Sequence, residues 1–461
     1  MTEMNTMVEP TGNQAPQGDG TVIVGAGITG LTVGAELARA GKKVVVLEAD
    51  DQVGGLCRSY ELDGITFDLG PHLFFYNQDF PPDHYMMSLL TDEVVIQNRF
   101  RFAIVGKGRH WKMPLNPLDI LLCYPWRYKK QILLSVLGKG EPSPAAPESL
   151  QCAMEQKTGN QYYQDIFGPL FFSKTGWPGG EIHNDWVVRV DRDINNNKKP
   201  FSGYDKVISL RHKLETIFRP TYYYPSGGFV RFAQRLAEII CENGGDVVCN
   251  CGQLTLERRK DILTGVTSRH QSYSPENVIW TPSVNQLNSL LGVSCQPLPY
   301  LDTAIVLLTY KRSRPKKRPY VYTYHIDEGT SFYRLYYPDN IFIKDRLPDR
   351  EGICAELLLT PSLGQLTDEE LMDRVAADIE KISLFRQEDL CMHRLFRLRE
   401  NLPFYGLDYE TSMESGYRTI HGIENLFSIG RRGGFYFCLT PAAINQGLQM
   451  AAHLLNNSQE E

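Results

Sequence analysis

A glycine-rich turn near the start of the chain has the residue types and spacing of a dinucleotide-binding site. Gly25, Gly27 and Gly30 form a GxGxxG pattern, which follows the short apolar run Thr21–Val24 and opens an amphipathic stretch. In such a pattern the first glycine supports a tight turn, the second lets backbone amides approach a pyrophosphate, and the third lets helix and strand pack closely. The pattern therefore predicts that this turn holds the phosphates of a dinucleotide.

A carboxylate stands where the next predicted strand ends. Glu48, followed by Ala49, comes directly after the apolar run Lys43–Leu47, and a carboxylate there can accept hydrogen bonds from both hydroxyls of an adenosine ribose. The predicted helix begins near Ile28 and Thr29, and its N-terminus presents unpaired N–H groups and a positive dipole end to the phosphates. Strand, helix and strand in this order predict a βαβ unit with a parallel sheet.

A second glycine pair follows in the loop after Glu48. Gly54 and Gly55 are followed by Leu56 and by the basic residue Arg58, so a flexible backbone and a cation come near the same pyrophosphate. A nicotinamide dehydrogenase has no need of this loop. Its presence favours FAD over NAD.

These motifs resemble those of the flavin-binding family that includes amine oxidases, protoporphyrinogen oxidases, phytoene desaturases and UDP-galactopyranose mutases. The stretch GITFDLGPHLFF resembles the family's segment in which a glycine loop and a histidine pass beside the flavin ring, which implies cofactor contacts for Gly70, Pro71 and His72. Val247 or Val248 falls where the family's adenine contact usually lies, and we assign Val248. No cysteine or histidine stands in a recognisable flavin-attachment motif, so we expect noncovalent FAD.

The run GRRGGFYFCLTPAAINQG near the C-terminus extends the resemblance. The βαβ unit holds only the ADP half of FAD, so another segment must hold the isoalloxazine ring. Gly430 and Arg431 are expected beside the pyrophosphate, at the end of a returning strand. Thr440 is expected to cap a helix whose positive end points at the flavin, where it favours the anionic reduced flavin by roughly 0.3–2 kcal/mol. Ala442 and Ala443 are expected at the same edge.

The resemblance implies an α/β chain with a Rossmann-like FAD-binding domain of the glutathione-reductase type and an inserted α+β substrate domain. The composition of the first residues predicts a disordered tail. The expected boundaries are 1–20 for the tail, 21–73, 205–298 and 400–461 for the FAD-binding domain, and 74–204 and 299–399 for the substrate-binding domain.

Arginines and tyrosines are the candidate substrate contacts. Arginines in a cavity over the flavin would fit carboxylates or a diphosphate, and tyrosines would supply apolar walls with a polar tip. The residues that we expect to contact substrate are Arg99, Arg101, Tyr337, Arg394 and Tyr405, and those that we expect to act in catalysis are His72, Arg334 and Tyr336. Taken singly, each such side chain is more often a surface or core residue than a ligand.

The combined pattern predicts an FAD-dependent oxidoreductase, similar to protoporphyrinogen and amine oxidases, that transfers a hydride from a small organic substrate to flavin N5. Two departures bear on the subfamily. The predicted strand Leu301–Thr309 has no lysine inside it, which weakens the case for amine oxidation, and the segment Phe435–Pro441 lacks the acid found in the mutases. A redox-neutral isomerase acting on a nucleotide sugar, similar to UDP-galactopyranose mutase, remains an alternative. A non-catalytic flavoprotein that binds a partner is another.

Composition argues against several other classes. The net charge is −6, from 48 basic and 54 acidic residues without long single-sign blocks, whereas nucleic-acid binding needs a concentrated basic face. The ten cysteines lack metal-ligand spacing, so we expect reduced thiols and no metal site. Because no apolar run is long enough for a membrane span and the first residues do not form a signal peptide, we expect a cytoplasmic protein. The sequence leaves the oligomeric state open.

Overall fold

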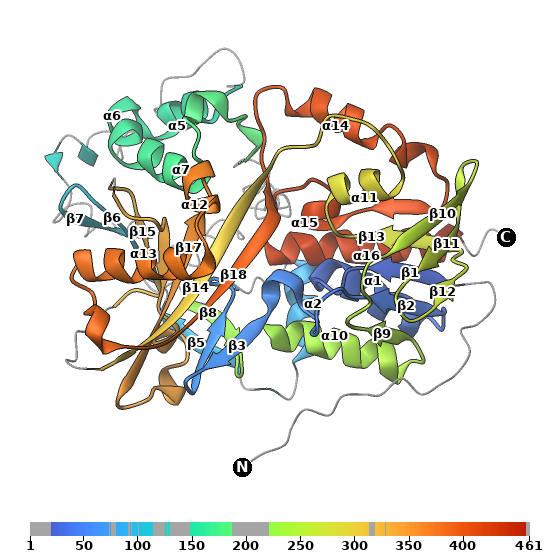
Figure 1. Cartoon of the computed structure of the whole chain (residues 1–461), viewed down its shortest axis with the longest axis horizontal. Coiled ribbons are helices and arrows are strands. Elements are labelled where there is room, and N and C mark those ends of the chain that lie inside the picture. Colours follow the sequence, from blue (N-terminus) through green and yellow to red (C-terminus); the bar gives the residue numbers. More distant parts are fainter. Residues whose placement is uncertain are drawn as a thin grey trace, which may run out of the picture.

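The computed structural model describes residues 20–72, 74, 80–90, 93, 95–99, 101–113, 125–126, 128–129, 148–186, 221–312, 319–327 and 329–457. It contains a parallel sheet and a mostly antiparallel sheet, which lie side by side with their own helices (Figure 1). The predicted tail over 1–20 lies outside the described residues except for Gly20. Parts of the predicted substrate-binding segment 74–204 lie outside them as well.

A five-stranded parallel sheet forms one half of the molecule. In spatial order its strands are β19 (Leu426–Ser428), β13 (Asn277–Trp280), β1 (Thr21–Val24), β2 (Val44–Leu47) and β9 (Asp246–Val248). The central strands are short apolar runs that are buried on both faces, which is typical of parallel sheets. The chain leaves β1 for β2 on one side and reaches β13 on the other, so the strand order reverses at β1.

Different elements cover the two faces of this sheet. On one face Ile23 and Val46 pack with helices, because α1 lies between α10 and α16. On the other face Val24 and Trp280 pack in a second cluster with a small antiparallel sheet and a short helix. The elements concerned are α1 (Ile28–Arg39), α10 (Val230–Glu242), α16 (Thr440–Asn457), β10 (Thr255–Arg259), β11 (Ile262–Thr267), β12 (Ser272–Tyr273) and α11 (Val284–Leu290).

A seven-stranded sheet forms the other half. Its spatial order is β18 (Leu390–Pro403), β14 (Tyr300–Lys311), β17 (Arg350–Leu358), β16 (Arg334–Tyr336), β15 (Tyr322–His325), β6 (Phe102–Gly106) and β7 (Arg109–Met113). All neighbouring strands are antiparallel except β15 and β6. Helix α13 (Asp368–Lys381) begins with a capping box between Thr367 and Glu370 and packs its apolar stripe against this sheet.

The register of three strands brings ionisable side chains together. Tyr324 of β15 lies opposite Arg334 of β16, and Arg334 lies opposite Glu356 of β17. Directly opposed residues of an antiparallel pair lie on the same face with their Cβ atoms about 5 Å apart. The register therefore places a tyrosine, an arginine and a glutamate side by side.

The remaining elements join or flank the two sheets. They are the hairpin β3 (Ser59–Leu62) and β4 (Ile65–Asp68), the pair β5 (Val95–Arg99) and β8 (Thr221–Pro225), and the helices α2 (Pro81–Leu89), α5 (Leu150–Thr158), α6 (Asn160–Tyr162), α7 (Gly168–Thr175), α12 (Pro361–Gly364), α14 (Tyr409–Tyr417) and α15 (Gly430–Gly433). None of the helices that the structure describes has the length and apolar character needed to cross a bilayer.

The observed elements agree with the predicted fold class but differ from prediction at the start of the C-terminal helix α16. All five strands of the parallel sheet fall within the segments predicted for the FAD-binding domain, and the Rossmann-like α/β class is confirmed. Thr440, however, is the first residue of α16 rather than its cap. The Leu439 carbonyl accepts the first helical bond, from the amide of Ala443, so the helix begins one residue earlier than a cap at Thr440 would require.

Candidate active site

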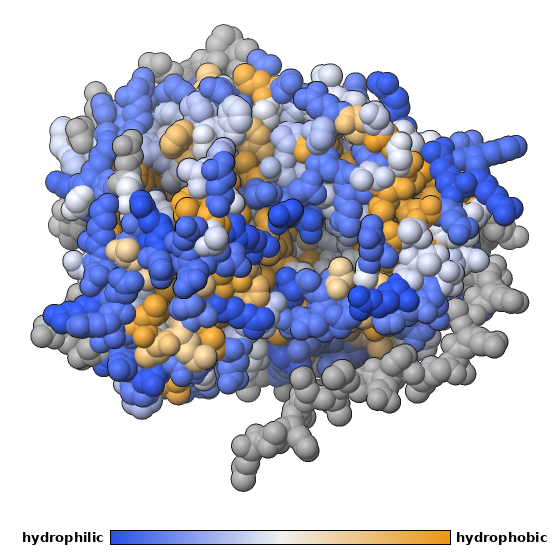
Figure 2. Space-filling view, viewed as in Figure 1, coloured by the Kyte–Doolittle hydropathy of each residue, from blue (hydrophilic) through white to orange (hydrophobic). Residues whose placement is uncertain are grey.

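A cavity of about 1000 Å³ opens at the carboxyl ends of β1, β2 and β13. This is where open α/β sheets bind ligands, because the strand order reverses there. Its wall combines the turn after β1, the loops after β2 and β13, a stretch of β18 and the start of α16. On the face seen in Figure 2, hydrophobic residues gather around a hollow near the centre of the molecule.

The three glycines of the first turn meet different surroundings. A Cβ on Gly25, whose φ is +99°, would overlap the Thr281 hydroxyl, and a Cβ on Gly30 would overlap the carbonyl oxygen of Gly25. A Cβ on Gly27 would meet no protein atom within 4 Å. Gly25 and Gly30 are therefore required by the packing of the protein, whereas Gly27 faces the open cavity.

The N-terminus of α1 points its donors at the same space. Gly27 is the residue before the helix and makes no side-chain cap, and Ile28 and Thr29 line the cavity with it. The first N–H groups of a helix lack partners within the helix and bind anions well. The open position at Gly27 and the uncapped helix end fit the pyrophosphate of a dinucleotide.

Glu48 lines the cavity beside this turn and is held by the backbone. One carboxylate oxygen accepts from the amide of Ala26 at 2.7 Å and the other from the amide of Asp50 at 3.0 Å. Each oxygen keeps further acceptor capacity for a ribose hydroxyl. The backbone contacts therefore orient the carboxylate without exhausting it, and Ala49 lines the cavity next to it.

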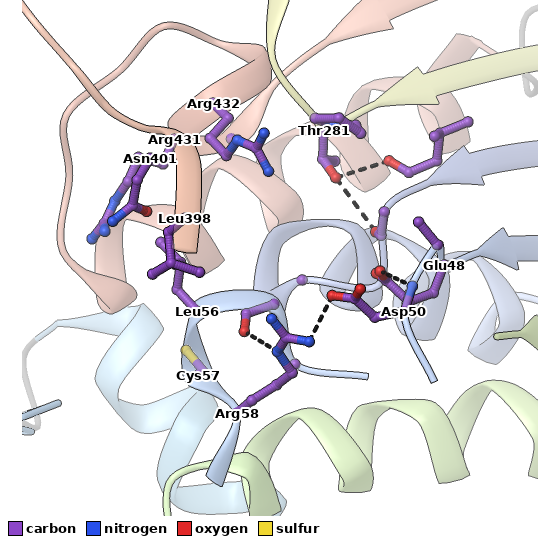
Figure 3. Close-up of a pocket in the computed structure, with 18 of the residues that line it drawn as sticks. Glu48, Asp50, Leu56, Cys57, Arg58, Thr281, Leu398, Asn401, Arg431 and Arg432 are labelled. Atoms are coloured by element: carbon purple, nitrogen blue, oxygen red, sulfur yellow. Dashed lines mark hydrogen bonds and ion pairs between the residues drawn. The ribbon is translucent and has the colours of Figure 1, made fainter. Parts of the chain in front are cut away.

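The loop after β2 is closed by an ion pair. Arg58 donates to Asp50 at 2.6 Å and to the carbonyl oxygen of Gly55 at 2.9 Å (Figure 3). Gly54 has a φ of +115°, and a Cβ on Gly55 would lie 3.2 Å from the Cα of Gly27. The sequence predicts a cation near the pyrophosphate, and the structure places Arg58 at the cavity with its charge already paired. Leu56 lines the wall beside it.

The C-terminal segment closes the other side of the cavity. The Thr29 hydroxyl donates to the Ala443 carbonyl at 3.1 Å, which ties the first turn of α1 to the first turn of α16. Gly430, Arg431 and Thr440 line the cavity with Ala443. Arg431 donates to the Cys438 carbonyl and lies across the close-up from Glu48 (Figure 3). Two segments about four hundred residues apart thus form one wall.

His72 lines the cavity as a neutral side chain. Its Nε2 lies 2.8 Å from the carbonyl oxygen of Leu56, and because a carbonyl can only accept, Nε2 carries the hydrogen. The ring stacks on Phe229 with centroids 5.0 Å apart. Burial, together with the charges of Arg431 and Arg334, lowers the pKa of His72 to about 4. At neutral pH the imidazole is therefore uncharged and oriented by its hydrogen bond.

Five other predicted cofactor contacts do not line the cavity. Gly30 and Ala442 are buried in the packing of α1 and α16. Gly70 has a φ of +91° and faces Glu356, and Pro71 lies between Gly70 and the cavity residue His72. Val248 also lies outside the lining. Its carbonyl accepts from the amide of Glu48, and the stretch 251–254 just after β9 lines the cavity instead.

The predicted substrate and catalytic residues are dispersed. Arg394 lines the cavity, with its guanidinium carbon 4.7 Å from the ring centroid of Tyr60. Arg101 is exposed, and the side chain of Arg99 lies outside the described residues. Arg334 does not line the cavity, because it forms a bidentate ion pair with Glu356.

The structure corrects three tyrosine assignments. Tyr336, Tyr337 and Tyr405 are buried in the core and do not line the cavity. The Tyr405 hydroxyl donates to the carbonyl of Phe435 at 2.9 Å and accepts from an amide of the same loop. The Tyr337 hydroxyl lies 3.1 Å from that of Thr323. The hydroxyls of Tyr337 and Tyr405 thus bond within the core, whereas the buried Tyr336 hydroxyl has no hydrogen-bond partner among the described residues.

Other cavity residues escaped the sequence analysis. Leu398, Asn401 and Arg432 lie with Arg431 on the side of the cavity that faces the α1 turn (Figure 3). Cys57 also lines the cavity, and burial raises the pKa of its thiol to about 12, so it remains protonated. Among the described residues no cluster could hold a metal ion.

Comparisons with known proteins agree with this geometry. A family model described as an NAD(P)-binding Rossmann-like domain matches residues 23–89. The inactive all-trans-retinol 13,14-reductase of Danio rerio is 36% identical over 111 residues, a match that covers 23% of this chain and 18% of that protein. Protoporphyrinogen oxidase 2 of Arabidopsis thaliana is 21% identical over 91% of both chains.

Solved structures resemble nearly the whole chain. Reduced UDP-galactopyranose mutase superposes with a TM-score of 0.73 at 18% identity, covering 96% of this chain and 94% of that one. Putrescine oxidase bound to putrescine gives a TM-score of 0.56 at 16% identity, covering 95% and 99%. The chain has the fold of these two enzymes. The resemblance predicted from the motifs is thus confirmed at the level of the fold.

Proposed function

We propose that the chain binds FAD noncovalently in this cavity and acts as an oxidoreductase on a small organic molecule. The observation that carries the proposal is the open position at Gly27, next to the uncapped N-terminus of α1 and the oriented carboxylate of Glu48. A wall that continues to Thr440 and Ala443 leaves room for more than a nucleotide. Bound FAD would supply a ring that accepts a hydride.

Each part of the wall then has a role. The α1 N-terminus binds the pyrophosphate, and Glu48 binds the adenosine ribose. The Arg58–Asp50 pair holds the loop that covers the phosphates. His72 stays neutral and orients the ring edge through a fixed tautomer. The first turn of α16 directs its dipole at the far end of the cavity, where it favours negative charge.

Two observations rank the oxidoreductase above a mutase. A mutase acting on a nucleotide sugar needs arginines that are free to bind a diphosphate. Arg334 is already neutralised by Glu356, and Arg397 donates to Asp368 at 2.7 Å. Arg334 and Arg397 are therefore committed to partners within the protein and are not free to bind a diphosphate.

The test compares two glycines that both tolerate a Cβ. Gly27→Ala and Gly364→Ala each place a methyl group where no protein atom lies within 4 Å, but only Gly27 faces the cavity. We expect purified wild-type protein and Gly364→Ala to carry FAD in equal amounts. Gly27→Ala should bind FAD at least tenfold more weakly, because its methyl group occupies the approach to the phosphates. The measurement is flavin absorbance and equilibrium binding after the flavin has been removed.

Two outcomes would overturn the proposal. Wild-type protein that neither retains nor takes up FAD would contradict it, and so would unchanged binding by Gly27→Ala. Reoxidation then separates the activities. Anaerobically reduced protein that turns yellow rapidly in oxygenated buffer favours an oxidase, whereas protein that stays reduced favours a dehydrogenase or the mutase. Bound FAD without turnover on any donor would indicate a non-catalytic flavoprotein.

A further inference from the structure

The cavity wall carries positive charge that the protein itself does not neutralise. The arginines that line the cavity are Arg58, Arg394, Arg397, Arg399, Arg431 and Arg432. Arg58 is paired with Asp50, and Arg397 is paired with Asp368. Among the described residues, none of the remaining arginines of the lining has a carboxylate at ion-pair distance. The cavity therefore has uncompensated charge for an anionic ligand.

The short helix α15 places one of these arginines at the carboxyl end of β1. The amide of Gly433 donates to the Thr281 carbonyl at 3.1 Å, and the Thr281 hydroxyl donates to the last carbonyl of β1 at 2.8 Å. At the start of α15, a Cβ on Gly430 would lie 3.3 Å from a hydroxyl in the first turn of α1. Arg432 lies between these two contacts in the sequence, so its backbone is held beside the α1 N-terminus.

The same contacts decide which part of the cavity Arg432 meets. Thr281 touches the glycine turn as well as α15, because a Cβ on Gly25 would lie 2.2 Å from the Thr281 hydroxyl. Gly27 belongs to that turn, and a Cβ there would meet no protein atom within 4 Å. Arg432 therefore stands at the part of the cavity where the backbone leaves room for phosphates.

The side chain of Arg432 is fixed near its base and open at its tip. Its Nε donates to the Glu400 carbonyl at 3.0 Å, and its own backbone carbonyl accepts from the Tyr300 hydroxyl at 2.6 Å. In the described part of the chain, no acceptor takes a hydrogen bond from its terminal nitrogens. The guanidinium projects into the open space that Glu48 and Asp50 border from the other side (Figure 3). Arg432 thus offers oriented donors and a full charge to a ligand.

The neighbouring Arg431 is directed to the other end of the cavity. Its Nε and one terminal nitrogen both donate to the Cys438 carbonyl, and its guanidinium carbon lies 5.8 Å from the ring centroid of Phe437. Burial and the charge of Arg431 lower the pKa of His72 to about 4. These contacts place Arg431 beside the loop before α16, so the two adjacent arginines serve different parts of the wall.

The phosphates of FAD need a cation at the nucleotide end. Both phosphates carry negative charge, and the N-terminus of α1 supplies only about half a positive charge. Arg58, the cation of the nearby loop, is neutralised by Asp50, and Glu48 adds negative charge. Charges that leave water without a partner are costly. The half-buried Arg432 has the planar fork that matches phosphate oxygens and no carboxylate partner among the described residues.

We propose that Arg432 binds the FAD pyrophosphate from the side opposite the α1 N-terminus, an inference that rests on the proposed binding of FAD. The phosphates then lie between a helix end and a guanidinium, and Arg58 holds its loop rather than the cofactor. The C-terminal segment thereby contributes to the nucleotide half of the site as well as to the flavin half. Flavin-free protein should bind ADP through the same arginine.

The test measures binding of ADP and of adenosine to flavin-free protein by calorimetry. These probes differ only in the two phosphates, so the comparison isolates the phosphate contact from the rest of the nucleotide. We expect Arg432→Gln to bind ADP about 10- to 100-fold more weakly than wild type, which is the loss expected for a hydrogen bond to a charged group. FAD binding should weaken to a similar extent. Adenosine should bind wild type and Arg432→Gln equally.

Arg397→Gln is the matched control. It removes the same charge from the same cavity wall, but Arg397 is bound to Asp368, which is 65% exposed. We therefore expect its ADP affinity to stay within about twofold of wild type. Arg432→Lys keeps the charge without the fork and should recover part of the lost affinity. Raising NaCl from about 0.05 M to about 0.5 M should weaken ADP binding more in wild type than in Arg432→Gln, because salt screens the charge contact.

Three results would overturn the inference. Unchanged ADP affinity in Arg432→Gln would show that the phosphates lie elsewhere. An equal loss in Arg397→Gln would assign the effect to the overall charge of the cavity, and a parallel loss of adenosine binding in Arg432→Gln would leave Arg432 with a structural role only. If wild type and Arg432→Gln bind FAD equally well, this inference alone fails. Wild-type protein that binds neither FAD nor ADP contradicts the proposed function as well.

Discussion

The two ends of the cavity are built by different means. At the end of the parallel sheet, the site consists of backbone: glycines that exclude side chains, amides of the α1 N-terminus, and a carboxylate held by two amides. At the other end, the wall consists of side chains that separate elements contribute, among them His72, Arg394 and Arg431. The comparison teaches that the proposed nucleotide site depends on one local turn, whereas the rest of the wall depends on how elements far apart in the sequence pack together.

Loss of one partner of the Arg334–Glu356 ion pair should have the largest effect on stability. In Glu356→Gln the Arg334 charge, whose side chain is only 20% exposed, loses its ion pair. Breaking such a buried pair costs about 3–5 kcal/mol in the free energy of unfolding. Urea denaturation measures the change, and Glu388→Gln, which loses an exposed pair with Arg386, should leave the midpoint unchanged. Equal midpoints for Glu356→Gln and Glu388→Gln would show that the buried ion pair contributes no more to stability than the exposed one.

The buried carboxyl of Asp68 should make the free energy of unfolding depend on pH, with an effect of intermediate size. Burial raises the pKa of Asp68 to about 6, against hydrogen bonds from Ser59, Tyr224 and the Phe229 amide that lower it. The folded state therefore binds the proton more tightly than the unfolded state does. Stability relative to Asp68→Asn should fall by about 2–3 kcal/mol as pH rises from about 4 to about 6, and then level off.

The opposite pKa shift of His72 affects both proteins equally, so it cancels in this difference. Its lowered pKa means that stability falls as pH drops from about 6.5 towards about 4. Denaturation curves of wild type and Asp68→Asn at matched pH values test the prediction. A constant difference across this range would mean that Asp68 is ionised throughout and that burial does not raise its pKa.

The smallest effect is expected at the backbone end. In Gly30→Ala the new methyl group overlaps the carbonyl of Gly25, which belongs to the backbone and cannot rotate away. Such overpacking costs about 1–3 kcal/mol. Gly364→Ala in α12 and Gly27→Ala should show no loss when flavin-free protein is unfolded in urea, because neither methyl group meets a protein atom. Equal loss in all three variants would remove the distinction between glycines that serve packing and the glycine that serves a ligand.

Prediction from the sequence was most accurate where a function is carried by consecutive residues. The strand over 21–24, the GxGxxG turn and Glu48 all lie at the cavity or beside it as expected, because a turn and its flanking elements follow from local spacing. The C-terminal run was assigned to the same site for a similar reason. Its cap was misplaced by one residue, since the exact start of a helix depends on which carbonyl accepts the first bond.

Prediction failed where a side chain's environment comes from other parts of the chain. Tyr336, Tyr337 and Tyr405 have the composition of a cavity wall, yet they are buried because their strands and loops turn them into the core. Arg334 was predicted to act in catalysis, but it does not line the cavity, and its ion pair with Glu356 follows from the pairing of β16 with β17.

The sequence by itself determined the local structure of the proposed nucleotide site. Glycine spacing, helix start and carboxylate position are properties of neighbouring residues, and backbone geometry carries them into the structure unchanged. Only the tertiary structure decided which ionisable groups meet at the other end. A pKa and an ion pair depend on distances across strands and on burial, and neither can be read from separation along the chain.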